Sequence, residues 1–156
     1  MTDKLYPYFT IMVGLPGTGK STHVKRYALP DAVILSTDNI IEKRCEFEGL
    51  TYSQGFKLFI DDATKQFNAE LAQALKDRKN IMVDRTNLTV NSRHKLLARV
   101  PKDYKKYAMY VPIPEDWSTR LANRPGKCIP DSVISTMMMD FQMPTLDEGF
   151  DAVFTV

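Results

Sequence analysis

The chain has 156 residues, of which 44% are hydrophobic and 26% charged, and its net charge is only +2. This length and composition predict a single globular domain over residues 1–156 and exclude disorder driven by charge. No apolar run reaches the roughly 18 residues of a membrane-spanning helix, and the N-terminus lacks the apolar stretch of a secretory signal. Because two cysteines cannot form a disulfide framework, we expect a cytoplasmic protein with no membrane contact.

Five short apolar runs are spaced along the chain and predict β-strands. They lie at residues 9–13, 32–35, 80–83, 107–111 and 152–156. Short runs without polar alternation are typical of a parallel sheet that is covered by helices on both faces.

Segments with helical periodicity separate these runs. The longest carries apolar residues from Phe56 to Leu75 at steps of mostly three and four, with Ser53 as its predicted N-cap. Pro114 and Pro130 can each open a further helix. The alternation predicts an α/β fold, a doubly wound parallel sheet of about five strands, with ligands bound beyond the carboxyl ends of the strands.

The strongest motif is GLPGTGKS at residues 14–21, which matches the P-loop pattern in full and follows a predicted strand. Its glycines let backbone N–H groups surround phosphate oxygens, and the helix that follows adds its positive dipole. Lys20 would reach the β- and γ-phosphates of ATP, and the Ser21 hydroxyl would bind Mg²⁺. The predicted nucleotide-binding residues are Gly14, Pro16, Gly17, Thr18, Gly19, Lys20, Ser21 and Thr22.

The rest of the chain narrows the class of P-loop protein. It has neither the Asn-Lys-x-Asp nor the DxxG motif of a GTPase, and one small domain is too short for a motor ATPase. A kinase remains, in which the hydroxyl of a second substrate attacks the γ-phosphate.

Two aspartates follow predicted strands. Asp38 comes after the second strand, where it would be either the base that receives the acceptor's proton or the N-cap of the next helix. Asp84 ends the third strand as in a Walker B motif, where it would hold Mg²⁺, position the acceptor or form a turn.

A basic segment near residues 117–130 predicts a helical lid. Arg120 and Arg124 are spaced to share one helix face, and the pair Pro125-Gly126 then breaks the helix. A mobile lid of this kind would present guanidinium groups to the phosphates of ATP. The other interpretation is a solvated basic face.

The order of these motifs resembles the kinase domain of the 5′-hydroxyl polynucleotide kinases, over nearly the whole chain. The resemblance is carried by the P-loop, Asp38, Asp84-x-Thr86-Asn87 with Ser92-Arg93 downstream, the lid arginine, Pro130 and the segment at residues 144–150. A compact kinase without a DxDGT phosphatase motif would suit a phage-encoded repair enzyme in the host cytoplasm.

The resemblance implies roles for the motif residues. Lys20 and Ser21 would bind ATP and Mg²⁺, Asp38 would be the general base, and Asp84 would place the acceptor or the metal's water shell. Arg124 would span the ATP phosphates in the transition state, with Arg120 as a weaker partner. The implied substrate-binding residues are Asp38, Asp84, Thr86, Asn87, Arg44 and Arg93.

Two departures concern the acceptor. The phage enzyme carries an arginine at the position of Ile41, where it grips the acceptor's phosphate, and the family often has an arginine at Thr37. Lys43 or Arg44 would have to substitute for it. We expect the path to Asp38 to be lined by basic residues drawn from Lys43, Arg44, Arg93 and Lys57.

The leading hypothesis is therefore ATP-dependent phosphorylation of the 5′-hydroxyl of a DNA or RNA end. The alternative is a kinase of the same superfamily that acts on a nucleoside or another small-molecule hydroxyl. A third hypothesis, a nucleotide-binding module without kinase activity, is disfavoured by the presence of Lys20, Ser21, Asp38 and Arg124 together.

Overall fold

A computed structural model of the chain describes residues 5–156. The first four residues, part of the N-terminus in which no secretory signal is predicted, lie outside this range. The elements are β1 (Tyr8–Val13), α1 (Lys20–Tyr27), β2 (Val33–Leu35), α2 (Thr37–Glu48), α3 (Tyr52–Lys76), β3 (Ile81–Val83), α4 (Val90–Leu97), β4 (Lys105–Tyr110), α5 (Trp117–Ala122), α6 (Asp131–Asp140), a 3-10 turn (Leu146–Glu148) and β5 (Ala152–Thr155).

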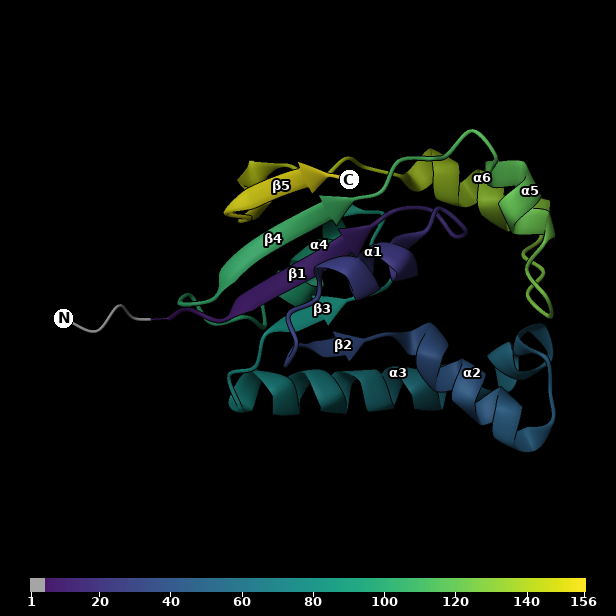
Figure 1. Ribbon diagram of the computed structural model, residues 1–156, viewed down its shortest axis with the longest axis horizontal. Helices are drawn as coiled ribbons and strands as arrows, with labels where there is room; N and C mark the ends of the chain where they lie inside the picture. Colours follow the sequence, from purple (N-terminus) through teal and green to yellow (C-terminus); the bar gives the residue numbers. More distant parts are fainter. Residues whose placement is uncertain (1–4) are drawn as a thin grey trace.

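The five strands form one parallel sheet in the order β2-β3-β1-β4-β5 (Figure 1). In the centre, Ile11 of β1 pairs with Val83 of β3 on one side and with Ala108 of β4 on the other. Each strand begins and ends within two residues of its predicted bounds. The predicted α/β architecture with a five-stranded parallel sheet is confirmed.

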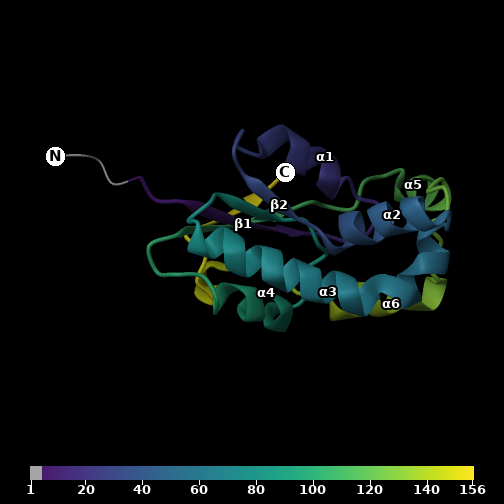
Figure 2. The same ribbon diagram turned by 90° about the horizontal axis from the view of Figure 1, so that it is seen from below.

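Helices cover both faces of the sheet because apolar side chains alternate along the buried strands. Ile11 belongs to the main core, which includes Phe67 of α3 and Leu97 of α4. Met12 points the other way and packs with Val24 of α1. Accordingly, α1 lies on one face of the sheet, and α3 and α4 lie on the other (Figures 1 and 2).

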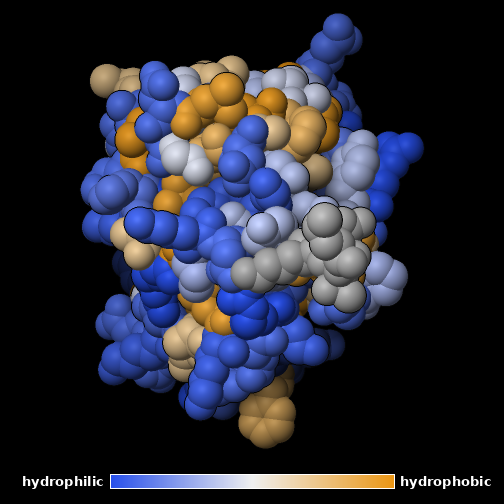
Figure 3. Space-filling model, turned by 90° about the vertical axis from the view of Figure 1, so that its left-hand side faces the viewer, coloured by the Kyte–Doolittle hydropathy of each residue, from blue (hydrophilic) through white to orange (hydrophobic). Residues whose placement is uncertain are grey.

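The two ends of the sheet differ. Helices α2, α5 and α6 gather where the strands end (Figure 1). The opposite end is largely hydrophilic, with an apolar area over β5 and the turn before it (Figure 3). In residues 5–156, no helix combines the length and apolarity required to cross a bilayer. Because ligands of parallel α/β sheets bind beyond the carboxyl ends of the strands, the site has to be sought at that edge.

Helix α3 begins differently from the prediction. Thr51 is the N-cap, and its hydroxyl accepts a hydrogen bond from the Gln54 amide (3.2 Å), while the Gln54 side chain accepts one from the Thr51 amide (2.8 Å). This capping box leaves Ser53 in the first turn, where its hydroxyl accepts from the Cys128 amide at 2.9 Å. The predicted cap Ser53 thus contacts the segment between α5 and α6.

Candidate active site at the carboxyl edge of the sheet

The P-loop connects β1 to α1 and wraps closely against its neighbours. Gly17 and Gly19 have φ angles of 76° and 99°, a region that favours glycine. A Cβ atom on Gly17 would also lie 3.0 Å from a methyl group of Leu121, so both conformation and space require glycine. The Gly14 amide donates to the Thr86 carbonyl (3.0 Å), which fixes the loop against the end of β3.

The other predicted P-loop residues have distinct surroundings. Thr18 is buried and its hydroxyl donates to the Leu15 carbonyl (2.9 Å). The Pro16 carbonyl accepts from the Trp117 ring nitrogen at 2.8 Å. Thr22 is exposed in the first turn of α1. The loop is thus held from inside by Thr18 and from the lid by Trp117.

Lys20 is buried at the base of this loop, and it forms no salt bridge with any of residues 5–156. Its ammonium donates to the Leu15 carbonyl (2.7 Å), and the side chain is only 9% exposed. Burial lowers the pKa of Lys20 to about 8, an effect that the charges of Asp84 and Asp38 partly oppose. A phosphate group bound at the loop would supply the missing anionic partner.

Ser21 and Asp84 meet beside Lys20. The Ser21 hydroxyl donates to Oδ2 of Asp84 at 2.8 Å, across the pairing of β1 with β3. Burial raises the pKa of Asp84, while the Ser21 hydroxyl and Lys20 oppose that rise. A hydroxyl and a carboxylate are the oxygen donors that Mg²⁺ accepts, together with phosphate and water oxygens. Ser21 and Asp84 therefore fit a P-loop magnesium site, where the ion would offset phosphate charge.

Asp38 lies in the first turn of α2 but does not cap it. The N-cap is Ser36, whose hydroxyl accepts from the Asn39 amide (3.2 Å). Asp38 instead accepts a short hydrogen bond on Oδ1 from the Tyr52 hydroxyl of α3. Burial and this carboxylate raise the pKa of Tyr52, so the hydroxyl stays protonated as a donor. The capping interpretation of Asp38 is wrong, and its second oxygen has no hydrogen-bond partner within residues 5–156.

The predicted lid, residues 117–130, contacts the start of α3. Its middle reaches from α5 and α6 to the start of α3 (Figure 1), where the Ser53 amide donates to the Gly126 carbonyl (3.0 Å). Lys127 forms an ion pair with Glu42 of α2, and its ammonium lies 4.5 Å from the Tyr52 ring centre. A cavity of about 630 Å³ lies between the lid and α3.

Arg120 and Arg124 do not share a helix face, contrary to the prediction. Helix α5 ends at Ala122, so Arg120 lies within it and Arg124 lies beyond it. The Arg120 guanidinium is 2.9 Å from the Asp116 carboxylate. Arg124 is half-buried, and its charge lowers the pKa values of both Lys20 and Tyr52. Arg124 thus acts on the site, and the Arg120 guanidinium also lies against the P-loop, 3.5 Å from where a Cβ atom on Gly19 would be.

Asn87 and Arg93 are structural in this arrangement, and their predicted contact with substrate is not met. Asn87 is buried with φ 46°, and its amide donates to the Met12 carbonyl (2.8 Å). Arg93 is 0% exposed, forms a two-pronged ion pair with Glu148 (2.6 and 3.1 Å), and donates to the Asn87 carbonyl. Because Arg93 is fully buried and each of its three guanidinium nitrogens donates a hydrogen bond within the core, it supports the loop that follows β3 and does not line an acceptor path.

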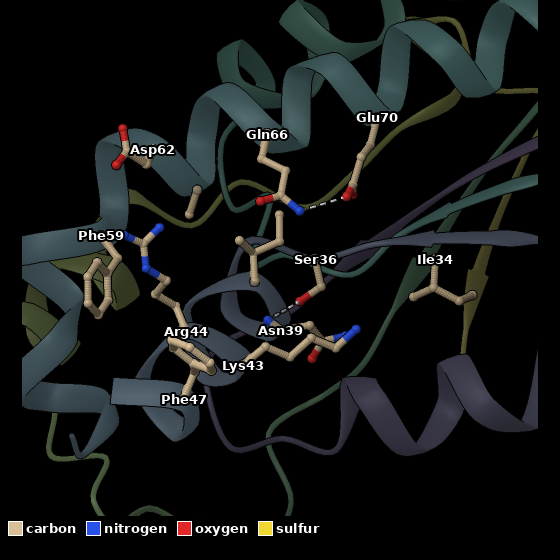
Figure 4. Close-up of a pocket in the computed structure, with 12 residues that line it drawn as sticks. Ile34, Ser36, Asn39, Lys43, Arg44, Phe47, Phe59, Asp62, Gln66 and Glu70 are labelled. Carbon is tan, nitrogen blue, oxygen red and sulfur yellow. Dashed lines mark hydrogen bonds between the residues drawn. The ribbon is translucent and has the colours of Figure 1, made fainter. Parts of the chain in front are cut away.

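Arg44 and Lys43 are also not brought to Asp38. They lie on a different face of α2, where they line a groove of about 450 Å³ between α2 and α3 (Figure 4). Arg44 lies over the ring of Phe59 (4.8 Å) and pairs with Glu48 (4.0 Å). Lys57 is exposed on α3. The expected basic lining from these residues is therefore not assembled around Asp38.

Three residues near the site were missed in the sequence: Tyr52, Arg85 and Lys127. Tyr52 contacts Asp38, and Lys127 contacts Tyr52 and Glu42. Arg85 directly follows Asp84, and its guanidinium carbon lies 4.8 Å from the Phe67 ring centre. The position of Arg85 at a strand end was the one available signal, since Tyr52 and Lys127 reach the site only through tertiary contacts.

Comparisons with known proteins identify relatives of this chain and structures with the same fold. Heterogeneous nuclear ribonucleoprotein U-like protein 2 of Homo sapiens and of Mus musculus is 24% identical over 154 residues. That match covers 92% of this chain and 20% of each relative, so the chain spans about a fifth of their length.

Two solved structures share the fold at low identity. One is a chain of the Pnkp1/Rnl/Hen1 RNA repair complex, with TM-score 0.67 and 23% identity over 88% of this chain and 45% of that one. The other is a gluconokinase from Sinorhizobium meliloti 1021, with TM-score 0.55 and 20% identity over 98% and 83%. The AAA domain family (AAA_33) matches residues 9–144. Since that match spans most of the sequence, this chain is a member of the AAA domain family and has the α/β fold of the P-loop kinases.

Proposed function

We propose that the chain is an ATP-dependent kinase that phosphorylates the 5′-hydroxyl of a DNA or RNA end. The observation that carries the proposal is the convergence of Lys20, the Ser21–Asp84 pair and Asp38 at one edge of the sheet. These groups supply a phosphate cradle, a metal-binding pair and a carboxylate that can receive a proton. The similarity to a chain of an RNA repair complex favours a nucleic-acid acceptor.

The proposed reaction assigns one task to each group. The acceptor oxygen forms a bond to the γ-phosphorus as the bond from that phosphorus to the β-phosphate oxygen breaks, and the hydroxyl proton passes to Asp38. The Tyr52 hydroxyl holds Oδ1, which leaves Oδ2 to accept the proton. Lys20 and Arg124 offset the charge that gathers on the phosphates.

A small-molecule kinase is the second candidate, because a gluconokinase shares the fold over most of both chains. The third hypothesis is a nucleotide-binding module without kinase activity. It is retained because the curated relatives are named as a ribonucleoprotein. The first two hypotheses differ in the acceptor that is phosphorylated, the third involves no phosphate transfer, and all three include ATP binding.

One assay distinguishes them: transfer of labelled γ-phosphate from ATP to 5′-OH DNA, 5′-OH RNA, free nucleosides and gluconate. The proposal predicts transfer to the oligonucleotides, with a rate that falls as salt screens the acceptor's phosphates. Equal efficiency on free nucleosides without salt dependence, or transfer to gluconate alone, would establish the small-molecule kinase. ATP binding without transfer to any acceptor would support the third hypothesis.

We expect ATP affinity to depend on pH through Lys20. An ammonium is needed to pair with the phosphates, and the pKa of Lys20 in the free protein is about 8. Binding should raise that pKa, so ATP binding at pH 8 should take up about half a proton and weaken with increasing pH above this value. Below about pH 7, Lys20 is already charged and affinity should level off.

Titration calorimetry at pH 8 in two buffers of different ionisation enthalpy measures this proton uptake. The Lys20→Met variant serves as the control, since it has no titrating group at this position. Binding that releases protons at pH 8, or the same uptake in wild type and variant, would contradict the assignment to Lys20.

The two lid arginines should differ in their contribution. Arg124→Ala should lower kcat roughly 10- to 100-fold with a smaller change in ATP affinity, because it removes a charge-assisted contact that is best made in the transition state. Arg120→Ala should cost less, since that guanidinium is paired with Asp116. Measured kcat and ATP Kd test this difference, and equal modest losses would instead indicate a solvated basic surface.

A further inference from the structure

The groove between α2 and α3 combines an apolar floor with charged walls (Figure 4). Ile40 of α2 and Phe59 of α3 line it, and both belong to an apolar cluster with the buried Ala63. The rim is formed by exposed polar and charged side chains of the two helices. An apolar centre with a polar rim is the usual anatomy of a protein–protein interface.

The two walls of the groove carry opposite charges. Lys43 and Arg44 form the basic wall on α2, and Asp62 and Glu70 form the acidic wall on α3. In residues 5–156 no ion pair crosses between these walls. Arg44 pairs with Glu48 of its own helix at 4.0 Å, and Glu70 accepts a hydrogen bond from its own helix at 2.9 Å. Each wall therefore still presents its charge to a second surface.

An exposed aromatic ring stands at one end of the groove. Phe47 of α2 is 88% exposed, and within residues 6–156 no other large apolar residue is more exposed. Phe47 and Phe59 lie at the same end of the groove, on opposite walls (Figure 4). A partner that covers this end would bury both rings, which is favourable because both are large and apolar.

A second copy of the chain meets these requirements in one arrangement. A two-fold axis parallel to the groove would place α2 of each copy over α3 of the other, so that each basic wall faces an acidic wall. A two-fold axis across the groove would instead bring like charges together, which is unfavourable. The parallel axis also keeps Phe47 at its own level along the groove, so its ring would meet Phe59 of the other copy. Because such a surface is its own complement, the contact is isologous and closes at two copies.

We infer that the chain forms a two-fold symmetric homodimer through the groove between α2 and α3. The Phe47 and Phe59 rings of both copies form its apolar centre, and the basic wall of each copy pairs with the acidic wall of the other. A foreign partner would need the same two rows of opposite charge, which this chain already carries. The inference does not depend on the proposed function, because it concerns the assembly of the protein and not its reaction.

Sedimentation velocity over a range of concentrations tests the apolar centre of this dimer. The wild-type mass should rise from 17.8 kDa toward twice that value as concentration increases. Phe47→Ser should raise the dimer Kd roughly 100-fold, since one substitution removes a buried ring from each side of the interface. Leu58→Ser is the matched control. It removes an apolar side chain that is 67% exposed on α3 but outside the groove, and it should leave Kd unchanged.

Charge reversal tests the pairing of the walls. A variant with Lys43→Glu and Arg44→Glu has two acidic walls, and a variant with Asp62→Lys and Glu70→Lys has two basic walls. Each should be monomeric alone, because like charges would then face each other. An equimolar mixture of the two should form a heterodimer, because every wall then meets its opposite. All substitutions change exposed side chains, and a cooperative thermal transition verifies that each variant is folded.

Three results would overturn the inference. The first is a wild-type mass that stays at 17.8 kDa up to roughly 1 mM, where even a weak complex forms. The second is a wild-type dimer that Phe47→Ser weakens no more than Leu58→Ser does, which would mean that another face of the molecule forms the contact. The third is a mixture of the two charge-reversed variants that remains monomeric, which would exclude the pairing of basic with acidic walls.

Discussion

Replacement of Lys20 by alanine is expected to lower the rate of γ-phosphate transfer about 1,000-fold, the upper range for loss of one preorganised charge-stabilising group. Lys20 is buried at the base of the P-loop, and within the described part of the chain its ammonium has only the Leu15 carbonyl as a hydrogen-bond partner. Without it, no side chain inside the loop offsets the charge on the transferring phosphate. The fold should survive, because a buried charge without an acidic partner contributes little to stability.

Labelled phosphate transfer and ATP-dependent thermal stabilisation test this expectation together. The variant should keep a cooperative unfolding transition and lose most of the stabilisation by ATP. Lys25→Ala, which removes an exposed lysine from the same helix, is the matched control and should behave as wild type. A Lys20→Ala protein with near-normal transfer would refute the assignment of the P-loop.

The framework of the site follows from local signals in the sequence. Apolar runs such as Ile81–Val83 define strands, and GLPGTGKS defines the turn that follows the first of them. Since the carboxyl ends of parallel strands share one edge, the positions of Asp38 and Asp84 after successive strands already imply that they lie near the P-loop. The charges of Asp38 and Asp84 indeed both act on Lys20.

The acceptor side could not be predicted in the same way. Arg93 pairs with Glu148, 55 residues further along, and no local pattern reports such a contact. Arg44 was assigned to the acceptor path by its nearness in sequence to Asp38, yet six positions along a helix change the direction of a side chain. Arg124 left the predicted face because α5 ends before it. In each case a tertiary contact or a helix end decided the outcome.

Contacts between the predicted lid and the first turn of α3 bring the lid close to Tyr52, the hydrogen-bond partner of Asp38. The Ser53 amide donates to the Gly126 carbonyl, and the Ser53 hydroxyl accepts from the Cys128 amide. The first turn of α3 therefore holds this part of the predicted lid beside Tyr52. Movement of the lid would thus change the surroundings of Tyr52 and, through its hydroxyl, of Asp38. Tyr52 thus lies between the predicted lid, through Lys127, and Asp38.

Asp38→Asn is expected to reduce kcat by roughly 10²–10⁴, the usual contribution of a general base, while ATP Kd changes little. Asparagine keeps the size of the side chain and can still accept a hydrogen bond from Tyr52, but it cannot take the proton of the acceptor hydroxyl. Asp61→Asn, an exposed position on α3, is the matched control. Labelled transfer gives kcat and calorimetry gives the ATP Kd. If kcat stays near the wild-type value, Asp38 only positions Tyr52, and the base must be sought elsewhere, with Asp84, whose pKa is raised by burial, as the first candidate.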